Sequence, residues 1–315
     1  MKAAIVTQAR ATPVYGEFAE PAPRADQFII DVSAAALSPL TRGRAAGSHY
    51  SAERSYPQVV GVDGVGRFGE QRVYFVLPEP PQGSMAERVA MVPERCVMLP
   101  DGLDDVAAAA LANPGMSSWA ALRHRAKLAA GETVLVNGAT GSAGKLAVQI
   151  ARHLGAKKVI ATGRNPAALQ DLARQGADVT LSLQDPAAFE DACREQFSQG
   201  VDVVLDYLWG PSAETLLSTA AKTAKDGVPL RYVEIGAASG GDIKLPGAVL
   251  RASAISLMGS GIGSVTMAHL LRSIEELFQA AGQSGFEVKT RAVPLAQVEQ
   301  AWATADSNER VVFTL

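Results

Sequence analysis

Short apolar runs separated by glycine and proline mark the N-terminal third of the chain. Each run has five or six residues, a length that suits strands better than helices. Irregular β-structure of this kind predicts a compact, barrel-like domain. The runs lie at residues 28–32, 58–62, 72–77 and 88–92.

A regular alternation of strand-like and helix-like segments follows. It predicts right-handed β-α-β crossovers and a doubly wound parallel sheet. The strand-like segments are apolar throughout, as expected when helices cover both faces of a sheet. The strands are predicted at 133–137, 158–162, 178–181, 202–207, 230–235 and 254–258, and the helices at 143–154, 166–175, 186–196 and 212–224.

The segment between these two regions has a helical pattern. Asp104 and Asp105 precede an apolar run, which places acids at the positive end of a helix. Pro114 and Gly115 predict the end of this helix, and a second helix is expected from Ser117.

The length of 315 residues favours two domains. After residue 264 one helix and two short β-like segments, at 286–293 and 311–315, are expected to return to the first domain. We therefore predict an α/β fold. Residues 109–262 form the doubly wound domain, and residues 1–108 with 263–315 form the β-rich domain.

The formal net charge is −3 and no long basic run occurs, so neither nucleic acid nor a membrane is an expected partner. No signal-peptide core and no long apolar segment is found. Cys96 and Cys193 stand far apart and outside any C-x-x-C pair. These features predict a cytoplasmic protein with reduced cysteines.

The strongest chemical signal is a strand that runs into a glycine-rich turn and then a helix. Gly141 and Gly144 have the spacing of the last two glycines of the dinucleotide fingerprint, while Ala139 stands where the first would be. The turn lets the backbone approach a pyrophosphate at the helix N-terminus. A tight turn without a ligand is the alternative. The residues assigned to the cofactor are Asn137, Ala139, Thr140, Gly141, Ser142, Ala143 and Gly144.

Arg164 lies twenty positions beyond Gly144, at the end of the second predicted strand. Sites for NAD carry Asp or Glu at about this distance, to hold the ribose 2′-hydroxyl. A guanidinium here would instead bind the 2′-phosphate of NADP. We assign Arg164 and Asn165 to NADP, and a solvated surface arginine is the alternative.

The sequence lacks the motifs of several other kinds of enzyme. The four histidines and two cysteines show no zinc-ligand spacing, so no metal site is expected. No G-x-S-x-G nucleophile elbow is present, and no tyrosine has a lysine four residues later.

Short motifs along nearly the whole chain resemble one family. They lie at 1–4, 61–66, 83–87, 99–103, 113–119 and 137–144. In this order they resemble the zinc-free quinone oxidoreductases of the medium-chain dehydrogenase/reductase superfamily. Zinc-dependent relatives carry Gly-His-Glu at the Gly61 turn and a cysteine near position 38, where this chain has Val62 and Ser38.

The resemblance implies a GroES-like domain, a Rossmann domain, an active site between them and a homodimer. It also implies zinc-independent hydride transfer from NADPH to a quinone or an α,β-unsaturated carbonyl. Ser38, Thr41 and Tyr50 then become candidate donors to the oxygen where negative charge develops, and Arg42 a cofactor contact. Ordinary loop polarity is the alternative for each.

Further cofactor contacts are expected around the ends of the parallel strands. Three of these positions also have a structural alternative: helix capping for Ser117, a buried core position for Tyr207 and a plain loop for 260–262. The candidates are Ser117, Tyr207, Ile235, Gly236, Ser260, Gly261, Ile262 and Asn308.

Two other functions remain open at this point. An enoyl-thioester reductase would share the fold and the hydride step. A non-catalytic NADPH-binding sensor would share only the cofactor site. The physiological acceptor is not indicated by the sequence, because loops assemble its pocket.

Overall fold

The computed structural model describes residues 1–53, 55–304 and 309–315. These residues form two compact units, the terminal unit (Met1–Met116 with Met267–Leu315) and the central unit (Ser117–Thr266). The units change at positions a few residues beyond the predicted limits of 108 and 262. Among the described helices, none is both long and apolar enough to cross a bilayer.

The central unit contains a sheet of six parallel strands, which confirms the predicted doubly wound architecture. The order is β11-β10-β9-β12-β13-β14, so the winding reverses beside β9. The strands are β9 (Thr133–Asn137), β10 (Lys158–Gly163), β11 (Val179–Ser182), β12 (Val203–Asp206), β13 (Leu230–Glu234) and β14 (Ile255–Gly259).

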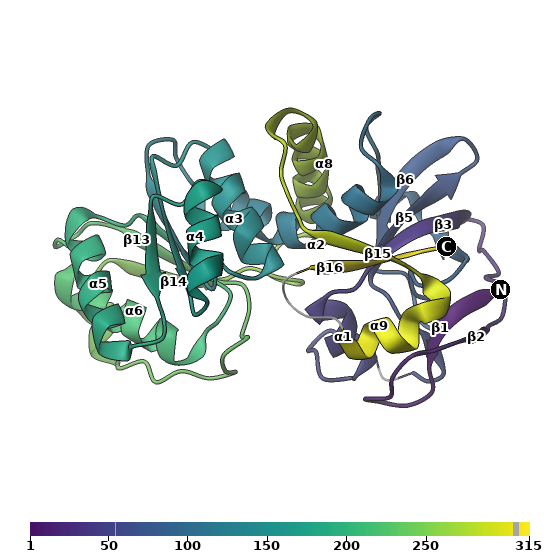
Figure 1. The fold of residues 1–315 in the computed structure, drawn as a ribbon, viewed down its shortest axis with the longest axis horizontal. Coiled ribbons are helices and arrows are strands. Elements are labelled where there is room, and N and C mark those ends of the chain that lie inside the picture. The colour runs from purple at the N-terminus through teal and green to yellow at the C-terminus, as the bar shows by residue number, and fades with distance from the viewer. Residues whose placement is uncertain (54, 305–308) are drawn as a thin grey trace. The chain divides into compact units, whose positions relative to one another are not determined.

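Helices cover both faces of this sheet. Figure 1 shows α3 (Ser142–His153) and α4 (Pro166–Arg174) on one face, and α5 (Pro186–Gln199) and α6 (Gly210–Thr223) on the other. Apolar side chains of α5 and α6 pack with Leu135 and Ile160 of the central strands in one buried cluster. This burial explains why the strands have apolar residues at successive positions. The short helix α7 (Gly247–Arg251) precedes the edge strand β14.

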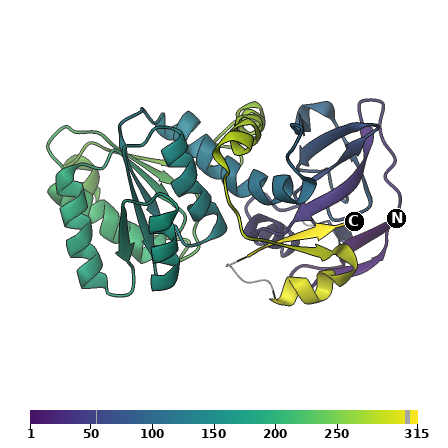
Figure 2. The same ribbon diagram turned by 45° about the horizontal axis from the view of Figure 1, so that its top comes forward.

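The terminal unit contains two β-sheets, one of three strands (β2-β1-β4) and one of seven (β15-β16-β3-β5-β6-β8, with β7 also paired to β3). β16 pairs antiparallel with β3, so the end of the chain lies in the same sheet as the N-terminal strands (Figure 2). The strands are β1 (Lys2–Val6), β2 (Val14–Glu17), β3 (Phe28–Ala36), β4 (Gln58–Val59), β5 (Asp63–Phe68), β6 (Gln71–Val76), β7 (Arg88–Met91), β8 (Cys96–Met98), β15 (Thr290–Pro294) and β16 (Arg310–Thr314).

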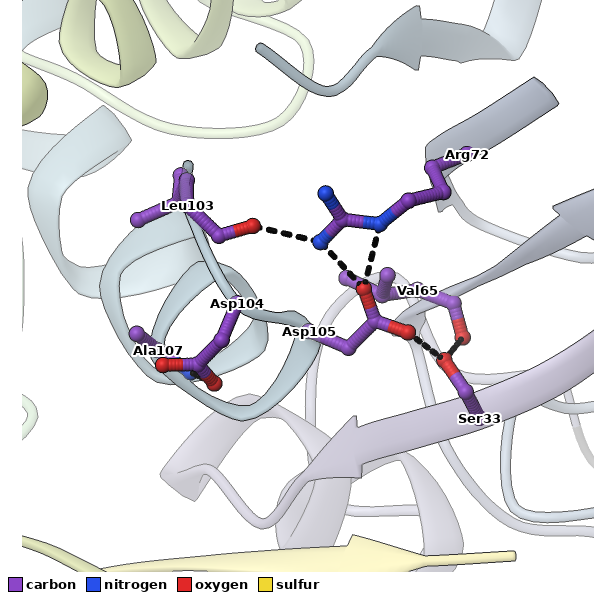
Figure 3. Close-up of polar contacts among 7 residues, drawn as sticks. All are labelled: Ser33, Val65, Arg72, Leu103, Asp104, Asp105 and Ala107. Carbon is purple, nitrogen blue, oxygen red and sulfur yellow. Dashed lines mark hydrogen bonds and ion pairs between the residues drawn. The ribbon is translucent and has the colours of Figure 1, made fainter. Parts of the chain in front are cut away.

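Helices complete the terminal unit: α1 (Pro39–Ala45), α8 (Met267–Ser284), α9 (Val298–Thr304) and the 3₁₀ turns η1 (Pro93–Arg95) and η3 (Leu295–Gln297). Helix α2 (Asp105–Ala120) begins in this unit at the position predicted. Asp104 accepts a hydrogen bond from the Ala107 N–H, and Asp105 accepts one from Arg72 Nε at 2.9 Å and one from the Ser33 hydroxyl at 2.6 Å (Figure 3). These bonds fix the first turn of α2 to strands β3 and β6.

The predicted break at Pro114 and Gly115 is wrong. Helix α2 continues through Pro114 to Ala120 and passes into a π-helical turn, η2 (Ala121–Ala126). A Cβ on Gly115 would lie 2.5 Å from Leu277 Cδ2, so the helix packs closely on α8 there. Tertiary packing of this kind can outweigh the ~3 kcal/mol that proline costs inside a helix. Ser117 therefore lies within a helix and does not cap one.

Candidate functional site

The glycine turn after β9 has the close packing that its sequence predicts. Gly138 has a φ of 85°, and a Cβ there would lie 2.7 Å from Leu208 Cγ. The left-handed turn is thus made one position before Ala139, whose side chain is fully buried. A Cβ on Gly144 would lie 2.4 Å from the Gly138 carbonyl oxygen, so α3 packs directly on the turn.

The N-terminus of α3 is open to a ligand. Its N-cap residue, Gly141, supplies no side-chain hydrogen bond to the first turn. A Cβ on Gly141 would meet no other atom within 4 Å. The unpaired N–H groups and the positive end of the helix dipole can therefore bind a phosphate beside Gly141, Ser142 and Ala143.

A buried network of hydrogen bonds holds this turn in position. The Asn137 amide donates to Asp206 Oδ1 at 2.8 Å and to Ser212 Oγ at 2.9 Å. Its oxygen accepts the Thr162 hydroxyl at 2.7 Å, and Thr162 Oγ1 accepts the Gly138 N–H at 3.0 Å. Asn137 has no exposed surface, so it holds the turn in position and presents no group to a ligand.

Asp206, at the end of β12, is the centre of this network. Its Oδ1 also accepts the N–H groups of Leu208 and Trp209, at 2.9 and 3.1 Å. Its Oδ2 accepts the Tyr232 hydroxyl at 2.6 Å. Burial and the nearby Asp206 carboxylate raise the pKa of Glu234, one strand further. The network therefore links the glycine turn to the ends of three neighbouring strands.

Arg164 lies beside the glycine turn. A Cβ on Gly163 would be 2.3 Å from Thr140 Cγ2, so the end of β10 contacts the turn directly. The Arg164 side chain is exposed, and no ion pair joins it to any of the described residues. The Asn165 side chain caps α4 by accepting the Ala168 N–H at 3.2 Å.

Tyr207 and Ser117, two predicted cofactor residues, lie together in the central unit. Burial raises the pKa of Tyr207 to about 12, and the hydroxyl groups of Ser118 and Ser117 oppose this rise. A Cβ on Gly236 would be 3.2 Å from the Tyr207 carbonyl oxygen, and the Gly236 N–H donates to the Asp206 carbonyl. Ile235 and Gly236 thus follow β13 beside the end of β12.

The residues 260–262 form a tight turn after β14. The Ser260 N–H donates to the Glu234 carbonyl at 2.8 Å, and the Gly261 N–H donates to Ser264 Oγ at 2.8 Å. Ile262 forms a β-bridge with Val265. These bonds give the turn a defined position next to the end of β13.

In the terminal unit, Ser38 and Thr41 form one hydroxyl pair at the start of α1. Ser38 Oγ accepts the Thr41 N–H at 2.9 Å, and the two hydroxyl oxygens are 2.9 Å apart. Both residues are buried, and one hydroxyl hydrogen of the pair remains free to donate elsewhere. Arg42 donates to the Trp302 carbonyl at 2.5 Å and lies over the Trp302 ring, so it also holds α9 in place.

Tyr50 is 73% exposed, and its ring lies 4.2 Å from that of His49. The predicted contact at Asn308 falls outside the described residues. Within the described ranges, no three His, Cys, Asp or Glu side chains gather in a way that could hold a metal ion.

The sequence interpretation missed the supporting residues Thr162, Asp206 and Tyr232. Asp206 did give a signal, because it is a single acid that ends an apolar strand next to the switch point of the sheet. Its side-chain partners come from β9 and β13, Thr162 of β10 joins the network through Asn137, and no local pattern connects these strands.

Comparison with known proteins gives similarity over the whole chain. The family model described as zinc-binding dehydrogenase matches residues 143–279. The probable NADPH-dependent quinone reductase tdiC of Emericella nidulans is 31% identical over 359 aligned positions, covering 99% of both chains. The quinone oxidoreductase of Sus scrofa is 29% identical over 203 positions, covering 61% of this chain and 60% of that protein.

Solved structures show the same fold. The quinone oxidoreductase of Thermus thermophilus, whose crystal structures include a complex with NADPH, superposes with a TM-score of 0.84 at 26% identity and covers both chains fully. The full-length match to tdiC and the order of the sequence motifs agree with this similarity. The chain therefore belongs to the quinone oxidoreductase branch of the medium-chain dehydrogenase/reductase superfamily of enzymes.

Proposed function

We propose that the protein is an NADPH-dependent oxidoreductase that transfers hydride to a quinone or an α,β-unsaturated carbonyl without zinc. The observation that carries this proposal is Arg164, an exposed guanidinium with no ion pair among the described residues, next to an uncapped helix N-terminus. The relatives named NADPH-dependent quinone reductase and quinone oxidoreductase support NADPH as the cofactor and a quinone as the acceptor.

The residues present fit a phosphorylated dinucleotide. The open side of Gly141 leaves room for a pyrophosphate against the first turn of α3. The Arg164 guanidinium, next to Gly163 and Thr140, would pair with a 2′-phosphate. Ser142, Ala143 and Asn165 would line the same side of the turn, and Tyr207, Ile235 and Gly236 the neighbouring strand ends.

The cofactor, when bound, would supply the hydride from its nicotinamide ring. The Ser38–Thr41 hydroxyl pair can donate one hydrogen bond to the acceptor oxygen as negative charge develops there. Tyr50 is the second proposed donor. No residue with the chemistry of a covalent nucleophile is required, since orientation and hydrogen bonding supply the rate.

Zinc independence rests on residue chemistry. Ser38 offers a neutral hydroxyl that is already bonded to Thr41, and Val62 offers a buried aliphatic side chain. Neither is a zinc ligand. Full activity after dialysis against a chelator, with no zinc detected by mass spectrometry, is the expected result. Activity that is lost on chelation and restored by zinc alone would contradict it.

The test of cofactor choice is a fluorescence titration with NADPH and NADH. We expect Arg164→Ala to weaken NADPH binding by about ten- to a hundredfold, because one charge-assisted contact is lost. Binding of NADH should change little. Arg174→Ala, which removes an exposed arginine from the far end of α4, is the matched control.

A turnover assay with four different acceptors identifies the reaction. NADPH consumption is followed with 1,4-benzoquinone, 9,10-phenanthrenequinone, an alkenal and an enoyl-CoA. Reduction of the first three supports the proposal. Reduction of the enoyl-CoA alone would identify a thioester reductase, and tight NADPH binding without any turnover would identify a sensor.

A homodimer through the edge strand β14 is the proposed assembly. β14 ends the six-stranded sheet and carries the exposed Leu257. Analytical ultracentrifugation is expected to give a dimer, and Leu257→Lys should shift it toward the monomer.

A further inference from the structure

A small pocket in the terminal unit lies between α1, β4 and the loop that follows β6. Its polar lining side chains are those of Thr41, Arg44, Gln58 and Gln82, and the Gln82 oxygen already accepts the Ala90 N–H. Val62 and Pro78 form part of its apolar wall. Its volume is about 30 Å³, which is room for about two water-sized groups. The pocket can therefore hold the two oxygens of a carboxylate, and nothing as large as a ring.

Gln58 brings a side-chain amide to this pocket. It is 9% exposed, and its backbone lies in the β4–β1 pairing opposite Val6. Its side chain makes no hydrogen bond to any residue in the described parts of the chain. The amide faces the pocket and is not a buried orphan, so a ligand that accepts its N–H would take the place of solvent there.

Arg44 brings a positive charge that no carboxylate neutralises directly. One nitrogen, Nη1, donates to the Ser51 carbonyl at 2.7 Å and to Ser51 Oγ at 3.0 Å. No salt bridge joins Arg44 to an acid among residues 1–53, 55–304 and 309–315. Burial and the nearby Arg95 lower the pKa of Arg44, against the attraction of Glu53, and Arg44 in turn helps to lower the pKa of His49.

We propose that this pocket binds a carboxylate between the Arg44 guanidinium and the Gln58 amide, and that the electron acceptor carries this carboxylate. Arg44 supplies the opposite charge and Gln58 a second donor, which is the combination that recognises a planar anion. Thr41, a proposed donor to the acceptor, lines the same pocket. The assignment of this carboxylate to the electron acceptor rests on the proposed function, whereas binding of a carboxylate in the pocket does not.

The binding test uses acetate as the probe and acetamide as its neutral counterpart, with the protein free of cofactor and the ionic strength constant. Isothermal calorimetry should show saturable acetate binding. Gln58→Glu, which keeps the shape but repels an anion, should weaken it by about tenfold or more, as should Arg44→Gln. Gln58→Met provides a second, uncharged variant. Gln71→Glu, at an exposed position of β6, is the matched charge control.

The kinetic test compares 4-oxo-2-pentenoate with 3-penten-2-one, in which a methyl group replaces the carboxylate. The ratio of their kcat/KM values should favour the acid and fall about tenfold or more in Gln58→Glu and Arg44→Gln, relative to Gln71→Glu. Equal ratios in all variants would overturn the assignment of the acceptor. Absence of saturable acetate binding would overturn the pocket itself. Acetate binding without reduction of any quinone or enone would instead reject the proposed function and leave the pocket standing.

Discussion

Replacement of Asp206 tests whether the buried network positions the glycine turn. The Asp206 carboxylate is fully buried and accepts hydrogen bonds from Asn137, Leu208, Trp209 and Tyr232. In Asp206→Ala all four donors lose this acceptor, and the Asn137 amide keeps only its bond to Ser212. The substitution therefore breaks the links from β12 to β9, to β13 and to the loop that follows β12.

The magnitude follows from the number of donors left without an acceptor. Each buried donor without a partner costs about 1–3 kcal/mol, and water entering the cavity recovers part of this, so Asp206→Ala should cost about 3–6 kcal/mol. Asp206→Asn keeps one oxygen for the N–H groups and loses the charged acceptor of Tyr232, which should cost about 1.5–3 kcal/mol. Tyr232→Phe removes the same bond and should cost a similar amount.

Urea unfolding followed by circular dichroism gives these free energies. Because Asp206→Asn and Tyr232→Phe remove one shared bond, the double variant should lose clearly less than the sum of the two. Ser212→Ala, which removes a neutral acceptor of Asn137 and a long hydrogen bond of 3.4 Å to the Trp209 carbonyl, should cost about 0.5–1.5 kcal/mol and serves as the control. A cost below about 0.5 kcal/mol for Asp206→Asn, or full additivity in the double variant, would show that the network does not support the turn.

Three further outcomes are expected. Gly144→Ala places a Cβ against the backbone of the turn and should cost about 1–3 kcal/mol, whereas Gly141→Ala should leave stability nearly unchanged and still weaken NADPH binding; urea unfolding and titration separate the two effects. Burial raises the pKa of Asp63 from 3.8 to about 6, so the folded protein binds a proton at this carboxylate more tightly than the unfolded protein does. The unfolding free energy should therefore fall by up to about 3 kcal/mol as the pH rises through the range between these two pKa values. The same measurement on Asp63→Asn, which lacks this titrating group, isolates the effect. Tyr50→Phe should lower kcat/KM about tenfold if its phenol donates to the acceptor, with stability unaffected because the residue is exposed; unchanged kinetics would exclude it.

The amino-acid pattern alone was enough to predict the elements of the central unit. The apolar segments from residue 133 onward became β9 to β14, because strands buried on both faces need apolar residues at successive positions. The glycine turn could also be predicted from the sequence, because Gly144 packs on the backbone at a distance that excludes any side chain. Arg164 was found by counting from that turn, which works because β10 runs parallel beside β9.

The way in which separate segments combine depends on the folded chain. The helix through Pro114 depends on packing against α8, which lies about 160 positions later in the sequence, so the local signal for a break was misleading. The partners of Asp206 come from two other strands and from the loop after β12, and the pocket of Arg44 and Gln58 joins a helix, a strand and a loop. Local propensity acts between neighbours in the chain, whereas burial, orphaned hydrogen-bonding groups and charge are properties of the folded surface and interior. For this reason the sequence predicted where the cofactor turn lies, and the fold alone revealed what supports that turn and which side chains are left without partners.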